Sequence, residues 1–198
     1  MIDKRIQKLI DPYLNFISLH LVRFGITANQ ITYFSLLFVI IVVVLLIYGE
    51  TYLAIIFILL NRICDGLDGS VARINGITKF GGYLDILADY IFYISVPLGF
   101  ALLSENNSFP TIVLLISYLL NSSSFFGLAA IKNFNKKDTN KKNKSFFYSF
   151  GYIEGTETIL FYIIICIFPN EFTLLTYLFS CFVFLTTINR IIWSSKNI

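Results

Sequence analysis

The sequence predicts an all-α integral membrane protein with six transmembrane helices and an N-terminal interfacial amphipathic helix. Of the 198 residues, 57% are apolar and only 14% are charged, which places the chain in the membrane class. Several apolar runs have the length that a bilayer requires, and short polar segments separate them. Nothing in the sequence resembles a soluble second domain. We therefore expect a single domain over residues 1–198.

The expected elements follow from hydropathy. Residues 2–24 mix basic and apolar side chains at helical intervals, interrupted by Pro12, and this pattern is typical of an interfacial segment. The six-helix bundle is expected over residues 31–193. Its spans are expected at residues 31–48, from residue 51 into an acidic stretch, and at residues 82–104, 110–131, 146–168 and 172–193.

The charge distribution predicts the orientation. Six alternating spans place all 15 Lys and Arg residues on one side or in the helix halves nearest to it, whereas the opposite loops contain none. By the positive-inside rule, both termini and the acidic stretch face the cytoplasm. Residues 132–145 form a basic cytosolic loop, which either binds anionic lipid or stays solvated. This loop lacks interleaved aromatic residues, so we expect no nucleic-acid partner. The abundance of Asn, Lys and Ile favours a bacterium, and hence an inner membrane.

The acidic stretch, residues 61–90, contains four aspartates in two pairs. Asp65 and Asp68 are three residues apart, and Asp85 and Asp89 are four apart, so each pair lies on one helical face. A short polar turn at residues 75–82 makes the two helices antiparallel neighbours. At about 1.5 Å of rise per residue, the inner member of each pair lies about 6 to 7 Å from the turn and the outer member about 12 Å. Four carboxylates at matched depths need a cation, and oxygen ligands favour magnesium, manganese or calcium.

Two alternatives compete with a catalytic metal site. The acids can form a paired network that holds the helices together, but only Arg62 and Arg73 are near enough in sequence to neutralise them. A cation transporter is the second alternative. In that case acids are expected to continue across the bundle, and broken helices or inverted repeats are expected; the sequence shows neither.

The acidic stretch resembles the signature of the CDP-alcohol phosphatidyltransferases, DxxDGxxAR followed by G and DxxxD. The matching residues are Asp65, Asp68, Gly69, Ala72, Arg73, Gly81, Asp85 and Asp89. Seven residues separate Arg73 from Gly81, where the family more often has eight, and this leaves the geometry of the turn open. The resemblance implies transfer of a phosphatidyl group from a CDP-linked lipid, such as CDP-diacylglycerol, to an alcohol with release of CMP. It also implies a homodimer embedded in membrane lipid.

The resemblance further implies roles for individual residues. Two Mg²⁺ (or Mn²⁺) ions are expected on the carboxylates of the four aspartates, with Asp89 also acting as the general base. Arg73 is expected to bind the diphosphate of the CDP group.

Small residues and the start of the first span complete the expected CDP site. Gly69 and Ala72 are expected to let the nucleotide approach the helix, although tight helix packing explains small residues equally well. Asn29 and Thr32 belong to a segment similar to the TPNxIT element near the family's cytidine site, with capping or turn roles as the alternative.

The acceptor site is less determined by the sequence. Arg62 lies one turn deeper than Asp65 and needs a partner, which is Asp65, a glutamate of the fifth helix or an anionic group on a substrate. Glu154 and Glu157 are expected on one face of that helix, where relatives that use phosphorylated acceptors carry arginines. We therefore expect a neutral, zwitterionic or cationic acceptor. A member that uses glycerol phosphate or inositol phosphate is the alternative.

Overall fold

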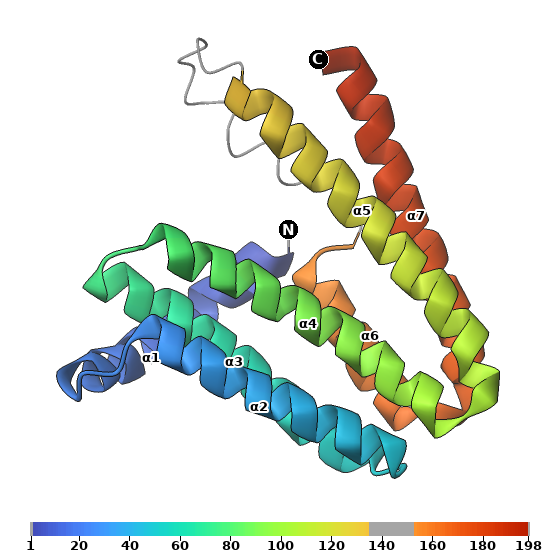
Figure 1. Ribbon diagram of the computed structural model, residues 1–198, viewed down its shortest axis with the longest axis horizontal. Helices are drawn as coiled ribbons and strands as arrows, with labels where there is room; N and C mark the ends of the chain where they lie inside the picture. The colour runs from blue at the N-terminus through green and yellow to red at the C-terminus, as the bar shows by residue number, and fades with distance from the viewer. Residues whose placement is uncertain (1, 135–152, 198) are drawn as a thin grey trace.

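The computed structural model describes residues 2–134 and 153–197, and all the regular elements in these ranges are helices (Figure 1). The predicted all-α class is therefore confirmed for the described chain. The elements, in order, are α1 (Ile2–Arg23), α2 (Ala28–Ile47), α3 (Thr51–Asn75), α4 (Lys79–Leu103), η1 (Glu105–Asn107), α5 (Ser108–Phe134), α6 (Gly155–Ile167), η3 (Pro169–Glu171) and α7 (Phe172–Asn197).

The helices form two groups. Helices α2, α3 and α4 lie side by side, and α1 packs against α3 (Figure 1). Helices α5 and α7 form a second pair, which meets α4 near its C-terminal end and diverges from it toward the other end (Figure 1). The shorter helix α6 contacts both groups, through α3 and α7.

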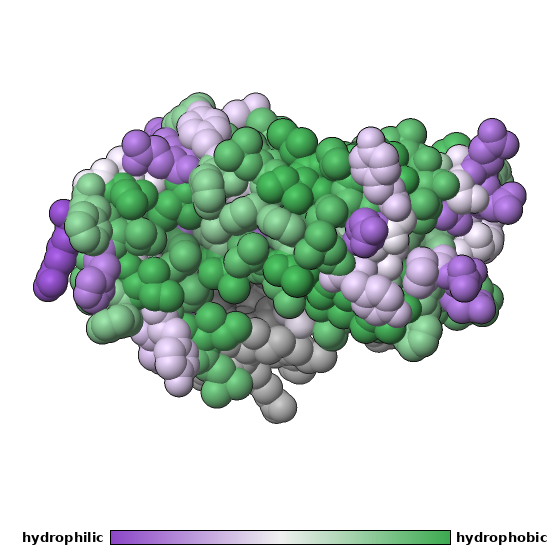
Figure 2. Space-filling model, turned by 90° about the horizontal axis from the view of Figure 1, so that it is seen from below, coloured by the Kyte–Doolittle hydropathy of each residue, from purple (hydrophilic) through white to green (hydrophobic). Residues whose placement is uncertain are grey.

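Four helical segments in the described chain are long and apolar enough to cross a bilayer, namely residues 28–47, 79–103, 105–131 and 169–196. Helix α3, which carries Asp65 and Asp68, is not among these four segments, and helix α6 has 13 residues. The count of six spans therefore stays a prediction. One face of the molecule is broadly apolar, with hydrophilic residues gathered mainly toward its two ends (Figure 2). Many large apolar side chains are exposed, among them Leu37, Ile56 and Leu87, as expected for contact with lipid.

Helix α1 differs from the expected segment in one respect. It continues through Pro12 without a break, and the predicted interruption is therefore wrong. Leu9, Tyr13 and Phe16 are largely exposed, at 73%, 74% and 65%. Burying this apolar surface at the head groups is consistent with an interfacial helix, which stays a prediction.

The connection between α3 and α4 is shorter than expected. It consists of residues 76–78 alone, so the predicted turn at residues 75–82 is wrong at both ends. Thr78 caps α4 by accepting a hydrogen bond from the Gly81 backbone N–H at 2.9 Å. Gly76 has a φ of 101°, a value that favours glycine. The sequence therefore closes this turn with three residues.

The start of the fifth helix also differs. Helix α6 begins at Gly155, and Glu154 is its N-cap rather than a residue on its face. The expected span of residues 146–168 begins outside the described residues. Most of the basic loop at residues 132–145 also lies outside them.

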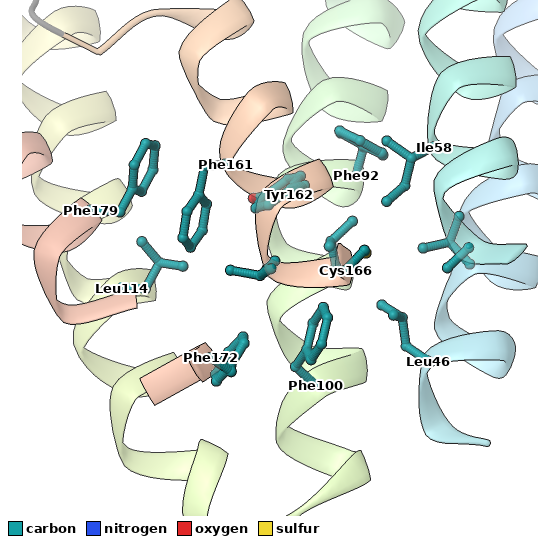
Figure 3. Close-up of a cluster of buried hydrophobic side chains, with 14 of the residues drawn as sticks. Leu46, Ile58, Phe92, Phe100, Leu114, Phe161, Tyr162, Cys166, Phe172 and Phe179 are labelled. Carbon is teal, nitrogen blue, oxygen red and sulfur yellow. The ribbon is translucent and has the colours of Figure 1, made fainter. Parts of the chain in front are cut away.

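The hydrophobic core fills the part of the bundle beyond the aspartates. Phe161 stacks on Phe179 with ring centroids 4.1 Å apart, and Phe100 stacks on Phe172 at 4.7 Å (Figure 3). Tyr162 is fully buried and donates a hydrogen bond to the Tyr93 carbonyl at 2.7 Å. These contacts join α6 to α4 and α7, and they leave the acidic ends of α3 and α4 outside the core.

Candidate active site

Helices α3 and α4 bring three of the four aspartates together. One carboxylate oxygen from each of Asp65, Asp68 and Asp85 lies within 4.8 Å of the other two. Asp68 is buried at 4% exposure, while Asp65 keeps 34% of its side chain exposed. Helix α2 packs against both α3 and α4, and three carboxylates of these two helices converge beside it. The cluster is therefore accessible from outside at Asp65 and buried at Asp68.

Asp89 lies outside this group of three. Its Oδ1 accepts a hydrogen bond from Arg62 Nη1 at 2.8 Å, and 32% of its side chain is exposed. Arg62 Nη1 also lies 3.6 Å from Asp65 Oδ2. Arg62 therefore has two carboxylate partners, one on each of the two site helices. Asp65 is one of the partners expected for Arg62, whereas Asp89 is a partner that the sequence did not indicate.

The first turn of α2 contacts both site helices. Thr32 is buried and its hydroxyl donates to Asp68 Oδ2 at 2.5 Å. Asn29 Oδ1 lies 3.2 Å from the position that a Cβ on Gly81 would take. A capping box between Thr27 and Gln30 fixes this end of α2, with the Thr27 N–H donating to Gln30 Oε1 at 2.9 Å. Thr32 thus orients a carboxylate, a contact that the sequence does not indicate.

The small residues expected at the nucleotide site differ in their surroundings. A Cβ on Gly69 would meet one side-chain atom of the described chain within 4 Å, Arg73 Nη1 at 3.7 Å. This surface of α3 is therefore not closed by helix packing, and Ala72 beside it is partly exposed. Arg73 is half exposed and lies 3.6 Å from Asp11 of α1. Its guanidinium remains within reach of a ligand over Gly69.

Helix α1 packs against a neighbouring face of α3, which the sequence does not indicate. A Cβ on Gly66 would lie 2.8 Å from Leu14 Cδ1, so the two helices approach closely at this glycine. The buried hydroxyl of Ser70 donates to Asn15 Oδ1 at 2.7 Å. A glycine and a serine between the site residues are the signals in the sequence for this contact. Packing by α1 therefore fixes the rotation of the helix that carries Asp65 and Asp68.

A cavity of about 310 Å³ is lined by Tyr90, the residue that follows Asp89 on α4, and by residues of three other helices. Helices α4, α5, α6 and α7 enclose it, and Tyr90 and Tyr93 contribute from α4. Its lining residues are Tyr90, Tyr93, Ile94, Leu115, Tyr118, Leu119, Asn121, Ser122, Ile153, Glu154, Gly155, Thr158 and Val183. Glu154 lines this cavity, whereas Glu157 does not and instead accepts a hydrogen bond from the Glu154 backbone N–H at 3.0 Å. Of the two glutamates expected at the acceptor, Glu154 is thus the one that lines the cavity.

Arg190 of α7 is a further polar residue that the sequence analysis missed. Its Nη1 donates to the Asn121 carbonyl at 2.7 Å, to Asn121 Oδ1 at 2.9 Å and to Ser124 Oγ at 2.7 Å. Its guanidinium also lies 5.6 Å from the centre of the Phe125 ring. In the described chain no carboxylate lies within ion-pair distance of it. Arg190 thus places a positive charge behind Asn121, one of the cavity residues.

The carboxylate cluster fits a divalent cation. Three acids converge, while within the described residues Arg62 is the one basic side chain paired with any of them, at 3.6 Å from Asp65. All the donors are carboxylate oxygens, which suit a hard cation such as Mg²⁺ or Mn²⁺. Asp65, Asp68 and Asp85 would hold the ion, while Asp89 follows Asp85 by four residues on α4 and is paired with Arg62.

Comparisons with known proteins show which family the chain resembles. Residues 25–188 match the family described as CDP-alcohol phosphatidyltransferase. The protein named Inner membrane protein YnjF from Escherichia coli (strain K12) is 36% identical over 196 residues, which cover 98% of this chain and 95% of that protein. A protein named Archaetidylinositol phosphate synthase from Pyrococcus horikoshii is 34% identical over 103 residues, or 52% of this chain and 54% of that protein. The chain belongs to the CDP-alcohol phosphatidyltransferase family.

Proposed function

We propose that this protein transfers a phosphatidyl group from a CDP-linked lipid, such as CDP-diacylglycerol, to an alcohol and releases CMP. The family supports an enzyme that uses a CDP-alcohol and an acceptor alcohol in a membrane. The observation that carries the proposal is the cluster of Asp65, Asp68 and Asp85, whose oxygens lie within 4.8 Å of one another. Asp89 follows Asp85 by one helical turn and is available for a separate task.

Each aspartate has a chemical role in this proposal. Asp65, Asp68 and Asp85 would hold two Mg²⁺ ions, and Asp89 would serve as a further ligand to the second. Such ions neutralise a diphosphate and stabilise the leaving phosphate. Asp89 accepts the proton of the acceptor hydroxyl as the acceptor oxygen attacks the lipid-bearing phosphorus. The bond from that phosphorus to the CMP phosphate oxygen then breaks, and CMP leaves with the electron pair.

The CDP group is assigned to the open surface of α3. Gly69 and Ala72 leave room for the nucleotide, and Arg73 offers a fork of N–H donors to its diphosphate. Asn29, at the start of α2, borders the same end of the helices through Gly81. Thr32 acts through Asp68, since its hydroxyl is already bound to that carboxylate.

The acceptor is assigned to the cavity lined by Tyr90 and Tyr93, the residues one and four positions after Asp89. Its described lining contains one carboxylate, that of Glu154, together with tyrosine, serine, threonine and asparagine side chains, and no lysine or arginine. Groups of this kind bind hydroxyls or a cationic amine better than a phosphate monoester. We therefore assign the cavity to a non-phosphorylated alcohol.

A second candidate is a phosphorylated acceptor, such as glycerol phosphate or inositol phosphate. Arg190 favours it, because its guanidinium lies directly behind Asn121 and has no carboxylate partner in the described chain. The name of the Pyrococcus horikoshii relative also indicates a phosphorylated product.

An acceptor panel tests the proposal. The purified protein is incubated with CDP-diacylglycerol and Mg²⁺ plus one alcohol at a time, and CMP and the lipid product are measured by mass spectrometry. Activity with an amino alcohol or a polyol that falls in Glu154→Gln and persists in Arg190→Gln supports the first candidate. Activity with glycerol phosphate or inositol phosphate that falls in Arg190→Gln supports the second. If none of the acceptors in the panel led to CMP release above that of an Asp85→Asn control, the proposed function would be overturned.

Further parts of the proposal concern the whole chain. We assign residues 1–198 to one domain, with both termini and the aspartates on the cytoplasmic side of a bacterial inner membrane. The apolar helices and the inner-membrane relative support a bacterial membrane protein. The homodimer implied by the family resemblance also belongs to this proposal.

A further inference from the structure

Several contacts within the protein fix the guanidinium of Arg62. Its Nε and Nη2 donate to Asn61 Oδ1 at 3.0 and 2.6 Å, and its guanidinium carbon lies 4.1 Å from the centre of the Phe92 ring. Asn61 is itself buried at 1% exposure and donates to the Ser35 carbonyl at 3.0 Å. A chain of contacts therefore runs from α2 through α3 to Arg62, whose side chain is 12% exposed.

The donors that remain on Arg62 point at the two site carboxylates. Arginine has five N–H donors in a rigid fork, and its Nη1 makes the contacts at 2.8 Å to Asp89 Oδ1 and 3.6 Å to Asp65 Oδ2. Within the described chain, Asp89 Oδ2 has no hydrogen-bond partner. One oxygen of Asp89 is thus fixed, and the other is left for a ligand or a proton.

We propose that Arg62 is a positioning residue that acts through Asp89, and that it does not bind a substrate anion. Arg62 lies three residues before Asp65 and outside the family signature present in this chain. The ion pair holds the Asp89 carboxylate toward α3, where the same Arg62 nitrogen also lies 3.6 Å from Asp65. Asn61, Ser35 and the Phe92 ring fix Arg62 in turn. The role in catalysis rests on the proposed function, whereas the ion pair itself does not.

Kinetics separate positioning from substrate binding. Arg62→Gln is expected to lower kcat by about 100-fold, the lower range for general acid–base catalysis, with KM for the CDP-linked lipid and for the acceptor nearly unchanged. Arg62→Lys keeps the charge and is expected to recover part of the loss, while Asn61→Ala is expected to show a smaller loss of kcat. Arg23→Gln, an exposed arginine at the end of α1, is the matched control and should behave as the wild type.

Thermal stability in detergent with EDTA provides a test that needs no activity. Asp89→Asn leaves the Arg62 charge without its closest partner, and Arg62→Gln leaves Asp89 unpaired, so each should lower the melting temperature. The double variant should lose less than the sum of the two, because neither charge remains unpaired.

The outcomes are distinct. Additive losses of melting temperature would overturn the ion pair, whatever the enzyme does. A rise in KM at constant kcat in Arg62→Gln would overturn positioning and make Arg62 a substrate ligand. Unchanged activity in that variant would also overturn it. If the wild type never releases CMP, the proposed function is overturned. Non-additive losses of melting temperature in Arg62→Gln and Asp89→Asn would still establish the ion pair in that case.

Discussion

The hydrogen bond from Thr32 to Asp68 shows how a residue outside the carboxylate cluster controls it. Both side chains are buried, so the hydroxyl has no competing water and holds one carboxylate oxygen at 2.5 Å. The other oxygen of Asp68 remains for a cation. Partners of this kind, one step removed from the ligand, orient metal-binding groups and tune their affinity.

Thr32→Val is therefore expected to weaken Mg²⁺ binding by about tenfold, because the isosteric side chain fills the site without donating a hydrogen bond. The measurement is the Mg²⁺ concentration that gives half-maximal CMP release. Thr32→Ser retains the hydroxyl and should restore the wild-type value. Equal Mg²⁺ requirements in the valine and serine variants would show that the bond has no such role.

Gly69→Ala tests the open surface of α3. The added Cβ would lie 3.7 Å from Arg73 Nη1, an ordinary contact, so the melting temperature should not fall. If the nucleotide lies against this glycine, KM for the CDP-linked lipid should rise by about tenfold, equivalent to about 1.4 kcal/mol. Gly82→Ala, whose Cβ would meet nothing within 4 Å, provides the comparison. Unchanged KM in Gly69→Ala would remove the nucleotide from this surface.

The arrangement of elements explains which parts of the site were predictable. Spacings of three and four residues, together with the helical rise, predict that the aspartates of α3 and α4 meet, and Asp65, Asp68 and Asp85 do converge. The ion pair between Arg62 and Asp89 was not predictable, because it depends on how α3 and α4 are rotated about their axes. Packing by Leu14 against Gly66 sets that rotation, and the sequence does not reveal which helix faces this glycine.

Other contacts were missed for similar reasons. Arg190 and Asn121 are 69 residues apart, and their contact follows from the packing of α7 on α5. Glu154 was placed on a helix face because the apolar run before it has the pattern of a continuing helix. The backbone at Glu154 is extended instead, with Glu157 accepting from its N–H, so a cap replaces the expected face.

The approach of α2 to α4 depends on Gly99. A Cβ at this position would lie 2.8 Å from Leu46 Cδ1 and 2.9 Å from Leu46 Cβ, and Leu46 is fully buried. Gly99→Ala is therefore expected to destabilise the protein by about 1 to 3 kcal/mol through overpacking. Thermal unfolding in detergent measures this. Gly127→Ala, whose Cβ would meet nothing within 4 Å of the described chain, should be neutral, and equal melting temperatures for the two variants would contradict the close contact.

At the scale of the whole molecule, the distribution of charge predicts a single orientation in the membrane. Asn106 lies in η1 and is exposed, in a loop without lysine or arginine, whereas Lys141 belongs to the basic segment. In a variant without the native cysteines, Asn106→Cys should react with a membrane-impermeant maleimide in intact cells. Lys141→Cys should react only after the cells are lysed. The reverse labelling pattern would place the aspartates on the outer side.

The hydrophobic core and the carboxylate cluster lie in different parts of the molecule. The stacked aromatic rings of α4, α6 and α7 form the core, while the carboxylates lie at the ends of α3 and α4 beyond it. Four acids within the acidic stretch oppose folding through their mutual repulsion, and the core with the α1 contacts offsets this cost. A bound divalent cation would attract each carboxylate and so outweigh that repulsion. Metal binding and stability should therefore rise together.

Manganese binding, measured by electron paramagnetic resonance on the purified protein without substrates, tests the central claim most directly. The wild type should bind Mn²⁺, and Asp68→Asn and Asp85→Asn should each lose most of this binding, because the ligands come from both α3 and α4. Glu171→Gln, which removes an acid from the opposite loop, is the matched control and should bind as the wild type does. Undiminished Mn²⁺ binding in both aspartate variants, or full CMP release in excess EDTA, would contradict the account.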